Sequence, residues 1–293
     1  MPQITLPQGV IEYRENGVGD SDAPVVVFVH GFLVDGSLWA ATADALARRG
    51  IRAIAPTLPL GSPRPAMRPD ADLSPRGVAR VVIAFLEALD LHDVTLVGND
   101  SGGAISQFVL DTDPSRVGRL VLTNCDAFDT FPPAPFDVMF RIARRRGVLR
   151  AGLEPMRLRA LRHSVLGYGV LSARPFDAEQ TRGWVMPFLS DAGVRRDTLR
   201  FLRAAEPADL LDVSTRLSRF TRPVLLCWAP QDRFFRIELG RRLAAVFPDA
   251  RLVEIGDART FVPLDQPERL AAEIAAFAPV PGANMAPAEG LMH

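Results

Sequence analysis

The segment Asp93–Gly103, DVTLVGNDSGG, decides the fold of this chain. It consists of an apolar run, a glycine, a short turn in which Asp100 and Ser101 are adjacent, and two more glycines. A sharp turn from a strand into a helix needs small residues on both sides of its apex, because the two backbones pass close together. The segment therefore predicts a strand, a tight turn and a helix, with one side chain held out over a sheet.

The spacing of the glycines indicates which residue stands at the apex. Gly98 and Gly102 flank Asp100 at the distances that such a turn requires, whereas an apex at Ser101 would place Asn99 where the first glycine belongs. We therefore expect Asp100 at the apex and a backbone N–H contribution from Ser101. The alternative is that Asp100 is only a structural residue of the turn.

Strand and helix patterns alternate on both sides of this segment. Val25–His30, VVVFVH, is a continuous β-branched run that is typical of a strand buried on both faces of a parallel sheet. Further strands are expected at 51–55, 94–97, 120–123, 223–227 and 251–255, and helices at 38–49, 75–89, 102–111, 237–247 and 267–276. The alternation predicts an α/β fold with a doubly wound, mostly parallel sheet.

The pattern changes after Asp126. Residues 128–215 contain proline breaks, many arginines and helical periodicity, but no clear buried strand. The sequence therefore predicts a core formed by residues 1–127 and 216–278, with a helical cap of residues 128–215 inserted between its halves. The Pro-, Gly- and Ala-rich tail, residues 279–293, is expected to be disordered.

Composition narrows the classes of function. The 293 residues include 34 acidic and 34 basic residues, all of the latter arginines, so the net charge is zero and no lysine can form a Schiff base. This balance favours neither nucleic acid nor an anionic membrane as a partner, and no nucleic-acid recognition module is visible. Cys125 and Cys227 lie in or beside apolar runs and are expected to be free thiols. Without a signal-like N-terminus or a long apolar run, we expect a cytoplasmic protein.

Four stretches together resemble the α/β-hydrolase superfamily. The segment around Asp100 is similar to that family's nucleophile turn, with Asp in place of the commoner Ser, as in haloalkane dehalogenases and epoxide hydrolases. Residues 30–32, HGF, resemble the loop that supplies an oxyanion donor, and residues 229–232, APQD, resemble the loop that bears the acid. Residues 260–268, TFVPLDQPE, resemble the segment that in the family begins with His-Phe. The resemblance extends from about residue 20 to about residue 277.

The resemblance implies a two-step reaction. A carboxylate at position 100 would attack carbon to form an ester, and a base would then activate water to hydrolyse it. The backbone N–H groups of Phe32 and Ser101 would stabilise the oxyanion. At the position of the family's histidine this chain has Thr260, preceded by Arg259, and neither side chain can act as a base near neutral pH. We expect the ester to form and then stall, unless another group removes the proton.

Other residues could contribute to the site. Asp232 matches the family's acid, and Asp126 follows an earlier strand at a second acid position; either could act on water or simply cap a turn. His30 is expected to be structural rather than an acid or base. Further candidates for the pocket are residues that could equally be packing or surface residues: Tyr168, as a proton donor, Trp184, as an apolar wall, and Arg259, as a partner of a carboxylate.

The sequence therefore predicts a hydrolase of a small, largely apolar molecule, namely an epoxide, a halide or an ester. Ser101 stands where dehalogenases carry the Trp that holds the halide, which counts against dehalogenation. The alternatives are a lyase, isomerase or cyclase that uses Asp100 as an acid or base, and an inactive small-molecule binder. No cofactor, metal, nucleic acid or membrane is expected, and the oligomeric state is left open.

Overall fold

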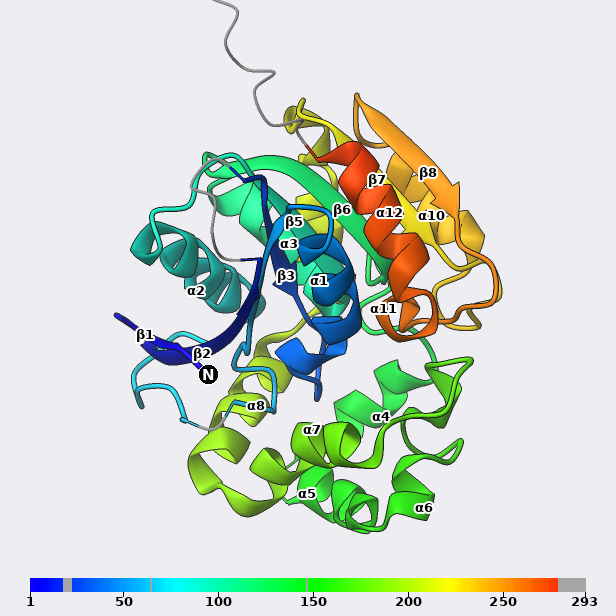
Figure 1. Ribbon diagram of the computed structural model, residues 1–293. Coiled ribbons are helices and arrows are strands. Elements are labelled where there is room, and N and C mark those ends of the chain that lie inside the picture. Colours follow the sequence, from blue (N-terminus) through cyan, green and yellow to red (C-terminus); the bar gives the residue numbers. More distant parts are fainter. Residues whose placement is uncertain (18–22, 64, 146, 279–293) are drawn as a thin grey trace, which may run out of the picture.

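An eight-stranded sheet runs through the computed structural model, which describes residues 1–17, 23–63, 65–145 and 147–278 (Figure 1). The strand order is β1-β2-β4-β3-β5-β6-β7-β8; β1 and β2 are antiparallel to their neighbours and the other strands are parallel. The strands are β1 (Gln3–Leu6), β2 (Gly9–Asn16), β3 (Val25–Val29), β4 (Arg52–Pro56), β5 (Val94–Asp100), β6 (Val117–Cys125), β7 (Val224–Trp228) and β8 (Ala250–Glu254). The predicted disordered tail, 279–293, lies outside the described residues.

Helices cover both faces of this sheet, and each face has its own apolar core. One face packs against α2 (Pro75–Ala88), α3 (Ser101–Thr112) and α10 (Ile237–Ala244). The other packs against α1 (Ala40–Ala47), α11 (Val262–Asp265) and α12 (Pro267–Phe277). The predicted α/β fold with a doubly wound, mostly parallel sheet is confirmed, because the continuous apolar runs are indeed strands buried on both sides.

Local differences from the prediction have local causes. The strands β1 and β2 were not predicted, because their side chains are partly exposed and give no apolar run. The helix expected at 38–49 begins instead with a 3₁₀ turn, Gly36–Trp39, whose first N–H groups are capped by Asp35 through a 2.7 Å bond from the Ser37 N–H. The start of α2 is as expected, since the Ser74 hydroxyl accepts the Gly77 N–H at 3.1 Å.

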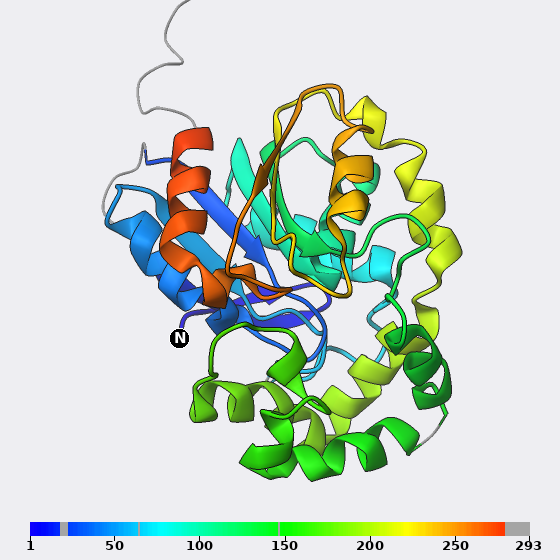
Figure 2. The same cartoon turned by 90° about the vertical axis from the view of Figure 1, so that its right-hand side faces the viewer.

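A layer of helices lies beyond the carboxyl ends of the strands (Figures 1 and 2). Its helices are α4 (Phe136–Ala143), α5 (Val148–Leu153), α6 (Arg159–Arg162), α7 (Ala178–Ser190) and α8 (Ala192–Ala204), with short 3₁₀ turns at Glu154–Arg157 and Tyr168–Val170. The chain returns through α9 (Pro207–Ser214), which contacts α3, and a 3₁₀ turn at Leu217–Arg219. Among the residues described between 128 and 215, no strand occurs. The exact division into core and cap stays a prediction.

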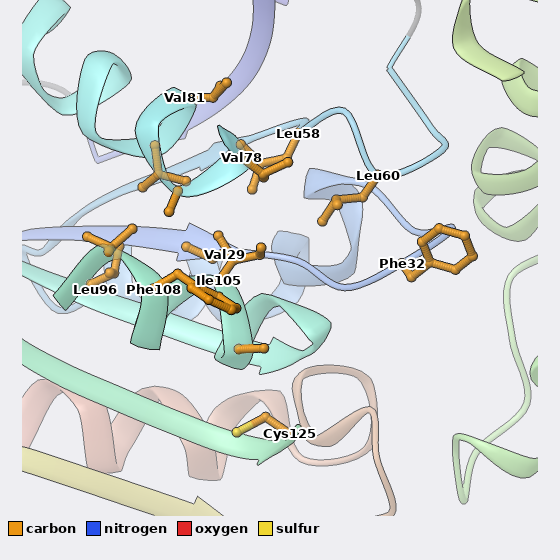
Figure 3. Close-up of a cluster of buried hydrophobic side chains, with 14 of the residues drawn as sticks. Val29, Phe32, Leu58, Leu60, Val78, Val81, Leu96, Ile105, Phe108 and Cys125 are labelled. Atoms are coloured by element: carbon orange, nitrogen blue, oxygen red, sulfur yellow. The ribbon is translucent and has the colours of Figure 1, made fainter. Parts of the chain in front are cut away.

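The apolar core continues from the sheet into this helical layer. Figure 3 shows Phe32 apart from the main cluster, beyond the end of β3 and toward the layer. Its ring lies 5.0 Å from that of Phe140 in α4 and 6.0 Å from that of Phe201 in α8. The chain leaves β3 for β4 on one side, whereas β5 lies on the other side, so the strand order reverses here. Open α/β sheets bind their ligands at such a point, at the carboxyl ends of the strands.

Candidate active site

Asp100 stands at the apex of the turn between β5 and α3. Its backbone adopts φ 55° and ψ −132°, a conformation that is costly for any residue with a side chain. The glycines make this turn possible: a Cβ on Gly102 would lie 2.1 Å from the Val29 carbonyl oxygen, and one on Gly98 would lie 2.8 Å from the Gly102 carbonyl oxygen. The geometry matches the prediction for position 100.

Backbone N–H groups surround the Asp100 carboxylate. The N–H groups of Phe32 and Ser101 both lie close enough to it to lower its pKa. The loop after β3 comes so close that a Cβ on Gly31 would lie 2.1 Å from Asp100 Oδ2. Two convergent donors at the start of a helix form an arrangement that can stabilise negative charge on an oxygen atom.

The surroundings of Asp100 disfavour its charged form. Burial raises the pKa of this carboxyl to about 7, and the negative charge of Asp232 adds to the effect, whereas the nearby backbone N–H groups of Ser101 and Phe32 lower it. Asp100 as a whole residue is nevertheless only half-buried, although protein atoms enclose its carboxylate on most sides.

Asp232 lies in the loop after β7, and one of its oxygens is free. Its Oδ1 accepts the N–H groups of Phe234 at 2.8 Å and of Phe235 at 3.4 Å, whereas Oδ2 has no hydrogen-bond partner among the described residues. Burial raises the pKa of the carboxyl. Asn124 holds the loop in place by donating to the Ala229 carbonyl at 3.0 Å and accepting its N–H at 2.7 Å.

Thr260 lies beside this free oxygen. Its hydroxyl is close enough to lower the pKa of Asp232, but it makes no hydrogen bond of ordinary length to any described residue. Asn99 fixes the Thr260 backbone, because its side-chain amide donates to the Thr260 carbonyl at 2.6 Å. The acid is therefore next to the position where the sequence pattern expects a base, but the side chain there is a buried hydroxyl.

Asp126, at the end of β6, is a third buried acid near Asp100. It is fully buried, and neither carboxylate oxygen has a hydrogen-bond partner within the described part of the chain. Burial and the charge of Asp100 raise its pKa well above the usual value, and the nearby Ser101 hydroxyl opposes this shift. The described residues contain no group of three or more His, Cys, Asp or Glu side chains that could hold a metal ion.

The His30 side chain forms hydrogen bonds that hold the loop carrying Phe32 in place. Its Nε2 accepts the Leu58 N–H at 2.7 Å, so the proton of the neutral ring is on Nδ1, which donates to the Gly31 carbonyl at 2.9 Å. Burial lowers its pKa. Both ring nitrogens are therefore hydrogen-bonded to the backbone, and His30 holds the loop after β3 against Leu58.

Tyr168 and Trp184 fasten the helical layer to the loop after β3. The Tyr168 hydroxyl donates to the Leu33 carbonyl at 2.5 Å, and the Trp184 indole N–H lies 3.1 Å from an Asp35 oxygen and 2.9 Å from the Ser37 hydroxyl. Both side chains are buried, and burial raises the pKa of Tyr168. The structure therefore gives the two aromatic residues packing and anchoring contacts.

Arg259 likewise contacts the helical layer. Its guanidinium donates to the Ser172 carbonyl at 3.2 Å, and its backbone N–H donates to Asp265 at 2.9 Å. Asp265 is fully buried and also accepts the Ser172 hydroxyl at 2.5 Å and the Arg174 N–H at 3.1 Å. This carboxylate ties the segment around Thr260 to the helical layer.

Sequence reasoning missed Asn99, Asn124 and Asp265, which orient the site without reaching a substrate. For Asn99 and Asn124 a signal was present, since each is a polar residue at the end of a buried apolar strand and must find partners there. Asp265 gave no comparable signal, because its partners in the helical layer, Ser172, Ala173 and Arg174, lie about ninety residues away along the chain.

Comparison with known proteins shows the family. The sequence profile of the family described as "alpha/beta hydrolase fold" matches residues 24–267. The chain therefore belongs to the α/β-hydrolase family. The structure is similar to a putative ancestral haloalkane dehalogenase, with a TM-score of 0.77 and 26% identity, covering 94% of this chain and 98% of that one.

Two relatives in sequence bear on the activity. The chain is 31% identical to haloalkane dehalogenase 2 of Mycobacterium bovis over 67% of its length and 68% of the relative. It is 28% identical to a 2-hydroxy-6-oxononadienedioate/2-hydroxy-6-oxononatrienedioate hydrolase of Cupriavidus pinatubonensis over 85% of both chains. The family and these relatives identify the chain as a hydrolase. Among the described helices, none is both long and apolar enough to cross a membrane.

Proposed function

We propose that the Asp100 carboxylate attacks an electrophilic carbon atom of a small, largely apolar molecule and forms a covalent ester. The observation that carries this proposal is the carboxylate at a strained apex, between the converging N–H groups of Phe32 and Ser101. An attacking oxygen must be ionised. With a pKa of about 7, roughly half of the Asp100 side chains carry the charge near neutral pH.

The first step forms a bond from an Asp100 oxygen to the substrate carbon and breaks the bond from that carbon to its leaving group. In an epoxide the leaving group is the ring oxygen, which then takes a proton from water or a nearby acid. Ser101 leaves the site without the tryptophan that would hold a halide. The rings of Phe32, Phe140 and Phe201 pack together between the loop after β3 and the helical layer. The absence of that tryptophan favours an epoxide, whose opening forms the ester, over an alkyl halide. An activated ester would instead transfer its acyl group to Asp100 and give a mixed anhydride.

The second step is hydrolysis of the ester. Water adds to the carbonyl carbon of the modified Asp100, and the resulting oxyanion lies at the N–H groups of Phe32 and Ser101. The proton of that water must go to a base. Asp232 offers its unpaired Oδ2, and Asp126 offers two unpaired oxygens. We propose that one of these carboxylates takes the proton, more slowly than a histidine would, so that the ester accumulates.

The test is to incubate the protein with a panel of epoxides, alkyl halides and activated esters and to measure its intact mass over time. We expect an increase equal to the mass of the transferred group, located on the peptide that contains Asp100. Asp100→Asn should give no increase. Substrate turnover without any adduct, or an adduct on another residue, would contradict the proposal.

A second candidate is a lyase, isomerase or cyclase that uses Asp100 as an acid or base. A pKa of about 7 suits a group that both gives and takes protons near neutral pH, and such reactions need no ester hydrolysis. Single turnover in water enriched in heavy oxygen separates the candidates, because only the ester route places that isotope in the Asp100 carboxylate. An inactive binder would return every ligand unchanged and form no adduct.

A further inference from the structure

Large apolar side chains are exposed along one stretch of the helical layer, residues 138–166. Leu166 and Val165 are 81% and 76% exposed, and Leu158 is 64% exposed. In the described part of the chain, Met1 and Leu211 are the only large apolar side chains outside this stretch with comparable exposure. We define the outer face of the layer by the most exposed of these residues: Val138, Met139, Ile142, Leu158, Val165 and Leu166.

The helix α4 shows that this exposure is unusual. Its inner side packs through Phe136, whose ring lies 4.9 Å from that of Phe234, and through Phe140, which lies against Phe32. Its outer side carries Met139 and Ile142, which are 50% and 49% exposed. A surface helix of a globular protein normally has polar residues on that side, so α4 is apolar on both sides and lacks a cover on one of them.

The same stretch concentrates positive charge. Residues 138–166 contain eight arginines and a single acidic residue, Glu154, a difference of seven positive charges in a chain whose net charge is zero. Arg145, Arg150 and Arg159 are exposed and form no ion pair with any residue that the structure describes. In Figure 1, α5 and α6 lie at the edge of the layer farthest from the sheet.

We propose that this outer face docks on the surface of an anionic lipid bilayer. Exposed aliphatic side chains can enter the boundary between headgroups and acyl chains, while neighbouring arginines bind the headgroup phosphates. Charge complementarity selects this occupant, because a second copy of the chain would bring the same exposed, unpaired arginines against one another. Acidic residues elsewhere in the chain balance the arginine excess of residues 138–166. The net charge of the whole sequence is therefore zero and did not indicate a membrane partner.

The test is co-sedimentation of the full chain with vesicles of phosphatidylcholine alone or mixed equally with phosphatidylglycerol. We expect binding to the anionic vesicles only, with the bound fraction falling as salt rises from about 0.05 to about 0.5 M. Replacing Arg150 and Arg159 with Gln should weaken the binding about tenfold. The double variant Arg14→Gln, Arg219→Gln removes the same charge from exposed sites of the sheet domain and should leave it unchanged.

The apolar contribution needs its own pair of variants. Met139→Ser with Ile142→Ser should also weaken vesicle binding about tenfold, because less apolar surface enters the interface. Leu211→Ser, at an exposed leucine of α9, is the matched control and should have no effect. All these side chains are exposed, so circular dichroism and thermal melting should show folded proteins throughout.

Several results would overturn the proposal. Equal binding to neutral and anionic vesicles would show that the arginines do not contribute to binding. Equal losses of vesicle binding in the test and control variants would show that this face is not the docking surface. Absence of vesicle binding would also refute it, whether light scattering then shows self-association of the chain or gel shifts show binding to a DNA duplex. The docking is independent of the chemistry at Asp100, so neither proposal falls with the other.

Discussion

The two halves of the candidate site, one around Asp100 and one around Asp232 and Thr260, differ in which polar groups they present. On the nucleophile side, Asp100 stands at a strained apex with two backbone donors and with glycines packed against the neighbouring chain. On the base side, Asp232 keeps a free oxygen and faces the hydroxyl of Thr260. The first side presents a carboxylate near two backbone N–H groups, whereas the second presents a hydroxyl beside a carboxylate.

The difference teaches that attack and water activation have separate structural requirements. The attack depends on backbone geometry, which many residues fix together and no single surface change can remove. Water activation depends on one side chain with a suitable pKa, and one substitution at position 260 is enough to lose it. In the proposed function, covalent chemistry at Asp100 proceeds without efficient turnover, and the following predictions test this separation.

The largest expected effect is at the apex itself. Asp100→Asn removes the charge of the nucleophile and should lower the rate of adduct formation by about 10⁴-fold or more, measured by intact mass. Ser101→Ala keeps the backbone N–H and should still form the adduct. An adduct that persists in Asp100→Asn and disappears in Ser101→Ala would reverse the assignment of the apex.

The next largest effect is expected at position 260, where a substitution should increase the rate of ester hydrolysis. Thr260→His places an imidazole beside the free Asp232 oxygen, which can accept its Nδ1 proton, and should accelerate ester hydrolysis by roughly 10²- to 10⁴-fold. Thr260→Val removes the hydroxyl without adding a base and serves as the control. The readout is the decay of the adduct after excess substrate is removed. No acceleration in a folded Thr260→His protein would show that more than the histidine is missing.

A stability measurement tests the backbone of the nucleophile side. Gly102→Ala forces a Cβ within 2.1 Å of the Val29 carbonyl oxygen and should lower the free energy of unfolding by about 3 kcal/mol or prevent folding. At Gly183, in the middle of α7, a Cβ meets nothing within 4 Å, so Gly183→Ala should stabilise the protein by about 0.5–1 kcal/mol. Urea denaturation of both variants gives the comparison, and equal effects would contradict it.

The smallest effect is the pH dependence. Because burial raises the Asp100 pKa to about 7, its ionised fraction grows about tenfold between pH 6 and pH 8, and the rate of adduct formation should grow with it. The stability changes in the opposite direction: the folded chain binds this proton more tightly than the unfolded chain, so the contribution of Asp100 to stability falls as pH rises from about 4 to about 7. A rate that is flat across pH 6 to 8 would exclude attack by this carboxylate.

Much of the fold followed from local patterns. The runs at Val25 and Val94 predicted buried parallel strands, and Ser74 with Pro75 correctly predicted the start of α2. The placement of Asp100 was also local, because glycine spacing alone selects the apex. The edge strand β1 and its neighbour β2 escaped prediction, since their half-exposed residues carry little apolar signal.

The sequence by itself determined the nucleophile turn, the order of strands and helices, and the hydroxyl at position 260, because each depends on residues that are close in the chain. Only the tertiary structure decided that His30, Tyr168 and Trp184 form hydrogen bonds to loop carbonyls and capping groups. It also decided that Asp126 and Asp232 lie close to Asp100. The physical reason is that a hydrogen bond or a buried charge depends on neighbours in space. Those neighbours come from strand ends far apart in the sequence, and only the assembled sheet brings them together.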